Sequence, residues 1–118
     1  MNVEEFRQYC ISKPGVTEGF PFGGDTLVFK VMNKMFALTG VDDFEFINLK
    51  CDPEEAIRLR EEYDAVKPGY HMNKKLWNSV YTQQGLSDDQ IMRWVDDSYD
   101  LIVASLPKKL QKELSELQ

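Results

Sequence analysis

The first segment of the chain has apolar residues at helical spacing. Val3, Phe6 and Cys10 recur every three or four positions between residues 2 and 12, which is the period of one helix face. A lysine, a proline and a glycine follow at 13–15, and this combination ends helices. We therefore predict an amphipathic helix over 2–12, followed by an irregular connection over the glycine-rich residues 19–25.

The next part of the chain changes to a period of two. Residues 26–31 alternate, Asn33 interrupts the run, and residues 35–39 resume an apolar stretch that favours β-structure. Within 45–51, Ile47, Leu49 and Cys51 fall on one face of a strand because side chains alternate between its faces. The pattern predicts three consecutive antiparallel strands.

Clear start signals mark the later helices. Asp52 is a good N-cap, Pro53 suits the first helical position, and Glu55 is placed to reach back to the cap amide, so we predict a helix to about residue 63. Ser87 repeats the capping logic before a long apolar helix face over 91–106. Pro107 then begins a short, leucine-rich terminal helix.

Residues 66–70 and 75–82 supply two further strand candidates between these helices. Strands that follow one another, rather than alternate with helices, favour an antiparallel sheet. We predict an α+β fold: a single domain over residues 1–118 with an antiparallel five-stranded sheet and helices packed on one face, in the order α-β-β-β-α-β-β-α-α. The apolar share of 42% and the charged share of 29% are those of ordinary globular proteins.

The cysteines and the N-terminus indicate the compartment. Cys10 and Cys51 lie far apart and lack metal-binding spacing, so we expect two reduced thiols. The N-terminal residues have neither the basic start nor the apolar run of a signal peptide, and no stretch has membrane-spanning length. We expect a cytoplasmic protein with no membrane partner.

Charge is distributed unevenly along the chain. The net charge is −6, and residues 1–64 carry all of it, with 13 acidic and 7 basic side chains. Residues 65–87 hold Lys67, Lys74 and Lys75 and no acid. The overall charge argues against generic adhesion to nucleic acid or anionic membranes, because the whole-protein field repels polyanions. A local basic contact remains open.

Catalytic and metal-binding patterns are weak. His71 is the single histidine, which excludes a multi-histidine metal site and a Ser-His-Asp arrangement supported by spacing. Gly23 and Gly24 precede a predicted strand and lack the ending of a phosphate-binding loop. The acidic groups at 42–45, 61–64 and 96–100 are typical of solvated turns and helix faces. We predict no catalytic residue, no metal site, no cofactor and no enzymatic activity.

One segment, KPGYHMNKKLWNSVY at 67–81, mixes cations with flat rings. Cations bind phosphates and rings stack on bases, so the mixture could serve DNA. The candidate residues are Lys67, Tyr70, His71, Asn73, Lys74, Lys75 and Trp77. Alternatively, the tryptophan points into the core and the lysines keep a strand edge from pairing with other molecules.

The same segment carries a family resemblance. Together with FRQYCISKPGVTE at 6–18, PFG at 21–23, KMFAL at 34–38 and WVDDSYDLIVASLPKK at 94–109, it resembles the MmcQ/YjbR family over nearly the whole chain. The resemblance implies an α+β fold similar to frataxin-like and type III secretion-chaperone-like domains. It also implies DNA binding, the function commonly given to the family, through the candidate residues above, and no assigned enzymatic activity.

Three functional hypotheses follow. The first is a DNA-binding domain that uses 67–81. The second is a protein-interaction adaptor with no nucleic-acid role, in which the open face of the sheet or the leucine-rich terminal helix receives a partner peptide or a second copy of the chain. The third, an enzyme or cation-binding protein, rests on acidic clusters and fold similarity alone and ranks last. The sequence leaves the partner and the oligomeric state open.

Overall fold

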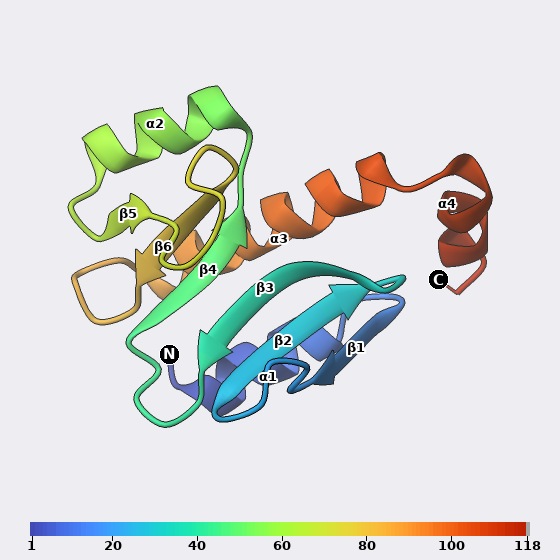
Figure 1. The fold of residues 1–118 in the computed structure, drawn as a ribbon, viewed down its shortest axis with the longest axis horizontal. Helices are drawn as coiled ribbons and strands as arrows, with labels where there is room; N and C mark the ends of the chain where they lie inside the picture. The colour runs from blue at the N-terminus through green and yellow to red at the C-terminus, as the bar shows by residue number, and fades with distance from the viewer. Residues whose placement is uncertain (118) are drawn as a thin grey trace.

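The structure is a computed structural model that describes residues 1–117, within which four helices and six strands form (Figure 1). The helices are α1 (Val3–Ile11), α2 (Pro53–Glu62), α3 (Asp88–Ser105) and α4 (Lys108–Ser115). The strands are β1 (Val16–Gly19), β2 (Thr26–Val31), β3 (Lys34–Gly40), β4 (Phe46–Lys50), β5 (Val66–Pro68) and β6 (Trp77–Tyr81). No helix within residues 1–117 is both long enough and apolar enough to cross a bilayer.

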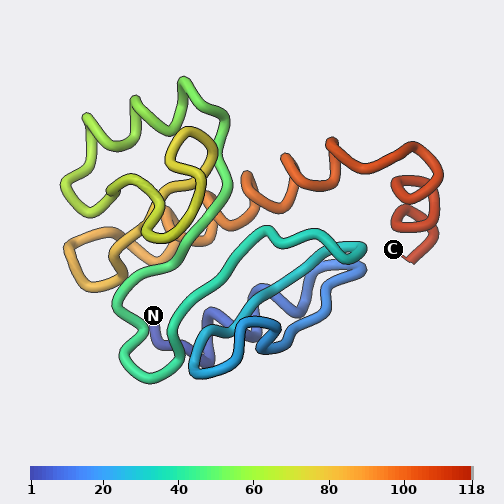
Figure 2. The backbone as a smooth tube through the Cα atoms, in the orientation of Figure 1, coloured from blue at the N-terminus to red at the C-terminus, as the bar shows by residue number. Residues whose placement is uncertain are grey.

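The strands form one sheet in the order β1-β2-β3-β4-β6-β5, and every neighbouring pair is antiparallel. Figure 2 shows the chain leaving β4 for α2 and β5 before it returns along β6. Although β5 is the edge strand, the loop between β5 and β6 folds over the sheet, because its Met72 and Leu76 pack against Val28 of β2 and Leu38 of β3. This position matters for the candidate site below.

The prediction of five strands is wrong by one. The extra strand is β1, whose Val16 pairs with Val31 at the edge of the sheet. It is only four residues long and has no buried residue, so its own sequence lacks the alternation that marks a strand. Arg7 on α1 holds it in place through two hydrogen bonds of 2.7 Å to the Glu18 carboxylate. This tertiary contact has no signature in the local pattern.

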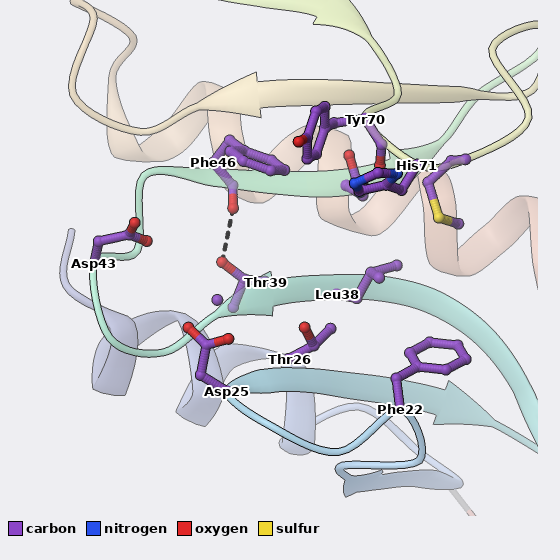
Figure 3. A pocket seen from close by; sticks show the side chains of 12 residues that line it. Phe22, Asp25, Thr26, Leu38, Thr39, Asp43, Phe46, Tyr70 and His71 are labelled. Atoms are coloured by element: carbon purple, nitrogen blue, oxygen red, sulfur yellow. Dashed lines mark hydrogen bonds between the residues drawn. The ribbon is translucent and has the colours of Figure 1, made fainter.

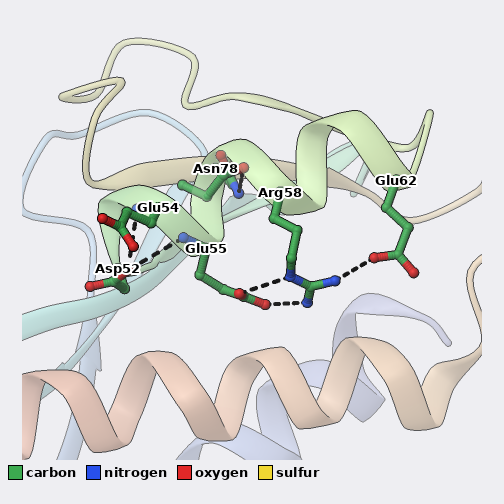
Figure 4. Close-up of polar contacts among 7 residues, drawn as sticks. Asp52, Glu54, Glu55, Arg58, Glu62 and Asn78 are labelled. Atoms are coloured by element: carbon green, nitrogen blue, oxygen red, sulfur yellow. Dashed lines mark hydrogen bonds and ion pairs between the residues drawn. The ribbon is translucent and has the colours of Figure 1, made fainter.

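The helix starts follow the predicted capping residues. The Asp52 carboxylate accepts hydrogen bonds from the amides of Glu54 and Glu55, at 3.2 and 3.3 Å (Figure 4). The expected return contact from the Glu55 side chain to the cap is not what forms, because this carboxylate pairs with Arg58, which also contacts Glu62. The first turn of α2 is therefore capped by the aspartate, while Glu55 and Glu62 share Arg58 in an ion-pair network on the helix surface.

Helices pack against one face of the sheet. Side chains from α1, α2 and α3 share a single buried cluster with the sheet, including Phe6, Leu59 and Val95. The opposite face carries only a small cluster of Val28, Leu38 and Trp77, which Met72 and Leu76 of the β5–β6 loop cover. We call this second side the helix-free face.

Candidate binding pocket on the helix-free face

The pairing of the central strands sets the floor of a pocket on the helix-free face. Val28 pairs with Leu38, Leu38 with Asn48, and Asn48 with Ser79, so these four side chains form a row across the sheet. Beside this row lies an open cavity of about 500 Å³ (Figure 3). Its volume falls in the range of about 300–1,000 Å³ that is usual for ligand sites.

One wall comes from the β1–β2 loop and the start of β2. Phe22 lines the pocket, yet its side chain is 64% exposed, although large apolar side chains are usually covered. Gly23 and Gly24 follow with φ of +75° and +59°, a left-handed conformation that glycine adopts without strain. The two glycines thus turn the chain directly after the phenylalanine, and Asp25 at the end of the turn also lines the pocket.

The opposite wall is the start of the β5–β6 loop, which buried polar groups hold in place. The Asn48 amide donates to the Tyr70 carbonyl at 3.1 Å, and the Ser79 hydroxyl donates to Asn48 Oδ1 at 2.5 Å. The same hydroxyl accepts a hydrogen bond from the Tyr70 amide at 2.9 Å. Both backbone groups of Tyr70 are therefore bound to the sheet beneath.

Backbone geometry explains why this loop lies so close to β6. A Cβ atom added to Gly69 would lie 2.8 Å from the Trp77 Cβ and 2.9 Å from the Trp77 carbonyl oxygen, which real structures do not tolerate. Glycine therefore permits the approach. His71 has φ of +58°, an unusual value for a residue with a side chain. Such strain is stored where surrounding contacts impose it, here at the pocket wall.

Aromatic rings form a continuous surface along this wall. The Phe46 ring contacts Tyr70 edge-to-face at 5.8 Å between centroids and Tyr81 at 5.3 Å. The Tyr70 ring in turn lies 4.1 Å from the His71 imidazole, and the Tyr70 side chain is 57% exposed. An exposed surface of this kind, beside a cavity, is typical of an interaction site.

The charge of the pocket is negative. Its acidic lining residues are Asp25 and Asp43, Tyr70 and His71 are its other titratable residues, and neither lysine nor arginine lines it. Figure 3 shows the two carboxylates at one end of the pocket and Phe22 toward the other. Asp43 Oδ1 accepts a hydrogen bond of 3.2 Å from the Glu45 amide, which fixes this carboxylate on the β3–β4 turn.

Six of the seven residues predicted for DNA binding separate into two groups. Tyr70 and His71 line the pocket. Lys67, Asn73, Lys74 and Lys75 are exposed but lie outside its lining. Two of these four have local roles in the loop: the Lys74 ammonium donates to the Gly69 carbonyl at 3.1 Å, and Asn73 Oδ1 accepts from the Lys75 amide at 3.0 Å.

Trp77, the remaining DNA-binding candidate, is placed differently. Its side chain is 7% exposed and packs with Val28 and Leu38 beneath the loop. The indole is therefore unavailable for stacking on a base in this conformation, and it serves instead as part of the core on the helix-free face.

Several pocket residues were outside the sequence predictions: Phe22, Asp25, Asp43, Phe46 and Asn48. Two signals pointed toward them. Phe22 belongs to the PFG block of the family resemblance, and the alternation that buries Ile47 and Leu49 places Phe46 and Asn48 on the opposite face. No local sequence pattern indicated that Asp25 and Asp43, which lie on separate turns, come together in the pocket.

A smaller cavity of about 230 Å³ lies between α2 and α3, where Cys51 and Asp97 line it. Burial, followed by the nearby carboxylates of Glu55 and Asp52, raises the pKa of the Cys51 thiol to about 11. Burial and the neighbouring Asp100 raise the pKa of Asp97. The thiol is a weak nucleophile, and no cluster of three metal-ligating side chains exists within the described residues.

Comparison with known proteins identifies the family of this chain. The sequence model of the family described as YjbR matches residues 11–101. The chain belongs to the YjbR family. The resemblance found in the sequence is thereby confirmed.

Relatives of this YjbR-family protein share its length. It is 38% identical to the uncharacterized protein YbdF of Escherichia coli O157:H7, over 94% of this chain and 92% of that protein. It is 36% identical to the uncharacterized protein YjbR of Escherichia coli K12, over 99% of this chain and all of that protein. These names state no activity, so they support the family assignment but assign no function.

Solved structures support the fold of the YjbR domain. The crystal structure of the Deinococcus radiodurans protein DR2400 superposes with a TM-score of 0.89 at 36% identity, over 97% of this chain and 88% of that one. The crystal structure of a Pseudomonas syringae protein gives a TM-score of 0.72 at 28% identity, over 86% of this chain and 98% of that one. The predicted α+β class with an antiparallel sheet is confirmed.

Proposed function

We propose that this YjbR-family protein is a non-enzymatic interaction domain that receives a segment of a protein partner in the pocket on its helix-free face. The observation that carries the proposal is the pair of exposed rings, Phe22 and Tyr70, on opposite walls of a cavity that no helix covers. Rings in such positions are frequent anchors of protein interfaces.

The polar groups of the pocket support binding rather than catalysis. Within residues 1–117, no hydrogen bond joins Asp25, Asp43 and His71 to one another, whereas a nucleophile or general base is usually oriented by a partner. The Thr39 hydroxyl donates to the Phe46 carbonyl at 2.7 Å, so it is engaged in joining β3 to β4. The Thr39 hydroxyl thus helps to hold the pocket in shape.

DNA binding is the competing proposal, and the exposure of Lys67, Lys74 and Lys75 favours it. Two observations make it the weaker one. The indole of Trp77 is buried, and the neighbouring pocket presents two carboxylates that would repel phosphates. A protein segment meets neither difficulty.

Selection from a random peptide library displayed on phage would test the proposal. We expect enriched peptides whose affinity, measured by fluorescence anisotropy, falls at least about tenfold in the variant with Phe22→Ser and Tyr70→Ser, the loss expected of interface anchors. Ile57→Ser is the matched control, because this side chain is also exposed, at 54%, but lies on α2 away from the pocket lining. No enrichment, or equal losses in both variants, would contradict the proposal.

Titration of a labelled DNA duplex is the second arm. If three lysines bind phosphates, the logarithm of the affinity should fall against the logarithm of salt concentration with a slope of roughly −2 to −3. Such binding, lost when Lys67, Lys74 and Lys75 are changed to alanine, would favour the DNA proposal over the interaction domain.

A further inference from the structure

We infer that the pocket selects a cationic side chain, a lysine or an arginine, from the partner segment. The aliphatic stem would pack along the ring surface of Phe46 and Tyr70, and the charged head would reach Asp25 and Asp43. The inference rests on the proposed function and specifies the chemistry of its ligand.

The first argument is the geometry of the two carboxylates. A Cβ atom built on Gly40 would lie 3.3 Å from Asp25 Oδ2 and 3.6 Å from Asp43 Oδ1. Both carboxylates thus reach the same point above Gly40, where the chain carries no side chain. Two negative oxygens around one space, in a pocket lined by neither lysine nor arginine, match an ammonium or guanidinium group.

The second argument is that both carboxylates have free acceptor capacity. The carboxylates that form ion pairs within residues 1–117 lie elsewhere in the protein: Glu4, Glu18, Glu55, Glu62, Asp88 and Asp96. Asp43 accepts one hydrogen bond, from the Glu45 amide. A carboxylate has about four acceptor sites, so most of the acceptor capacity of these two groups is unused.

The third argument is the ring surface, which suits the rest of such a side chain. Lysine and arginine pack their methylene stems on apolar surface while the charged head stays near water or a counter-ion. A cation within about 6 Å of a ring centroid also gains electrostatic attraction. Phe46 and Tyr70 supply such a ring surface in the same pocket as the carboxylates (Figure 3).

The protein already uses this combination internally. The Lys13 ammonium lies 5.0 Å from the ring centroids of both Tyr9 and Tyr99 and 2.5 Å from Asp96 Oδ1. One lysine is therefore held by two rings and a carboxylate at a partly buried position of this chain. The pocket presents partners of the same kinds, namely the carboxylates of Asp25 and Asp43 and the rings of Phe46 and Tyr70.

Peptides that differ at one residue test the inference. In the tightest sequence from the display selection, the pocket-binding position would carry lysine, arginine, norleucine or glutamate. We expect lysine and arginine to bind about two- to fivefold more tightly than norleucine, which has the same stem and no charge, because a partly exposed ion pair contributes modestly. Glutamate should bind more weakly than norleucine.

Charge-removing variants of the protein supply the control. In the double variant Asp25→Asn and Asp43→Asn, lysine and norleucine peptides should bind equally, whereas Asp42→Asn should preserve the difference. Asp42 is an exposed acid on the same turn that does not line the pocket, so it reports on general charge alone. Amide chemical shifts of Gly40 and His71 would confirm where each peptide binds.

The two proposals fail in different ways. If the selection yields no peptide, the proposed function fails and the inference falls with it. If peptides bind at the pocket but norleucine matches lysine, only the inference is overturned. Butylammonium is a small cation with a similar stem. It should shift the Gly40 amide signal only at concentrations at least about a hundredfold above those of the peptide, because it lacks the other contacts of the peptide. An affinity of butylammonium equal to that of the peptide would overturn the assignment to a protein side chain.

Discussion

Replacing Asn48 by alanine tests how the sheet holds the wall of the pocket. The side chain is 4% exposed at the centre of β4 and joins the Tyr70 carbonyl to the Ser79 hydroxyl. Asn48→Ala removes both hydrogen bonds. The Ser79 hydroxyl, which is fully buried, then loses its acceptor, whereas the contact to the Tyr70 carbonyl is only partly buried.

The magnitude follows from this difference in exposure. An unsatisfied buried polar group costs about 1–3 kcal/mol, so Ser79 contributes within that range and Tyr70 about 1 kcal/mol. We expect the free energy of unfolding to fall by about 2–4 kcal/mol. Asn73→Ala is the matched control, because its side chain makes one exposed contact in the same loop and should cost about 1 kcal/mol or less.

Urea unfolding followed by circular dichroism gives both values, and an unchanged dependence on denaturant would show that the folded state is intact. Amide hydrogen exchange adds a local measurement. The Tyr70 amide donates to Ser79 Oγ, so in Asn48→Ala it should exchange faster than the change in global stability accounts for. Equal destabilisation by Asn48→Ala and Asn73→Ala, with unchanged Tyr70 exchange, would refute the reasoning.

Two further predictions concern the helical side. Ser98→Ala should lower the unfolding free energy by about 2–4 kcal/mol, because the buried hydroxyl donates to the Phe36 carbonyl at 2.6 Å and accepts from the Lys50 amide at 2.9 Å. Ser105 is an exposed serine on the same helix, so Ser105→Ala should change the unfolding free energy by about 0.5 kcal/mol or less. Urea unfolding measures both values, and equal effects of the two substitutions would be contrary to this prediction. The rate at which iodoacetamide modifies Cys51 should still rise steeply with pH near about pH 10, because only the thiolate reacts and the pKa of this thiol is raised from 9.0 to about 11. A rate that reaches a plateau just above pH 9, as for an unfolded thiol, would count against this prediction.

Most of the fold could be predicted because its signals are local. Asp52 and Ser87 cap helices through their own side chains, and both contacts form as the sequence indicates. The edge strand β1 could not be predicted in the same way, because the ion pair between Arg7 and Glu18 that fixes it joins two different elements. Short edge strands depend on such contacts more than on their own pattern.

The candidate site was predictable in part for the same reason. Tyr70 and His71 were identified because rings and cations cluster in one segment, and they line the pocket. Trp77 belongs to the same segment, but its side chain is buried beneath the loop. Asp25 and Asp43 belong to different turns, and only the pairing of β2 with β3 brings them to one place. The likeness to frataxin-like and secretion-chaperone-like domains, DNA binding and the cellular compartment stay predictions.

The loop between β5 and β6 should tolerate substitution unevenly along its length. Its inner residues, Met72 and Leu76, shield the apolar patch around Trp77 from water, while its outer tip at 73–75 is exposed. Substitutions at the tip can accumulate without exposing that patch. Changes at Gly69 would lift this shield and the pocket wall together, so they would expose the apolar patch and favour aggregation.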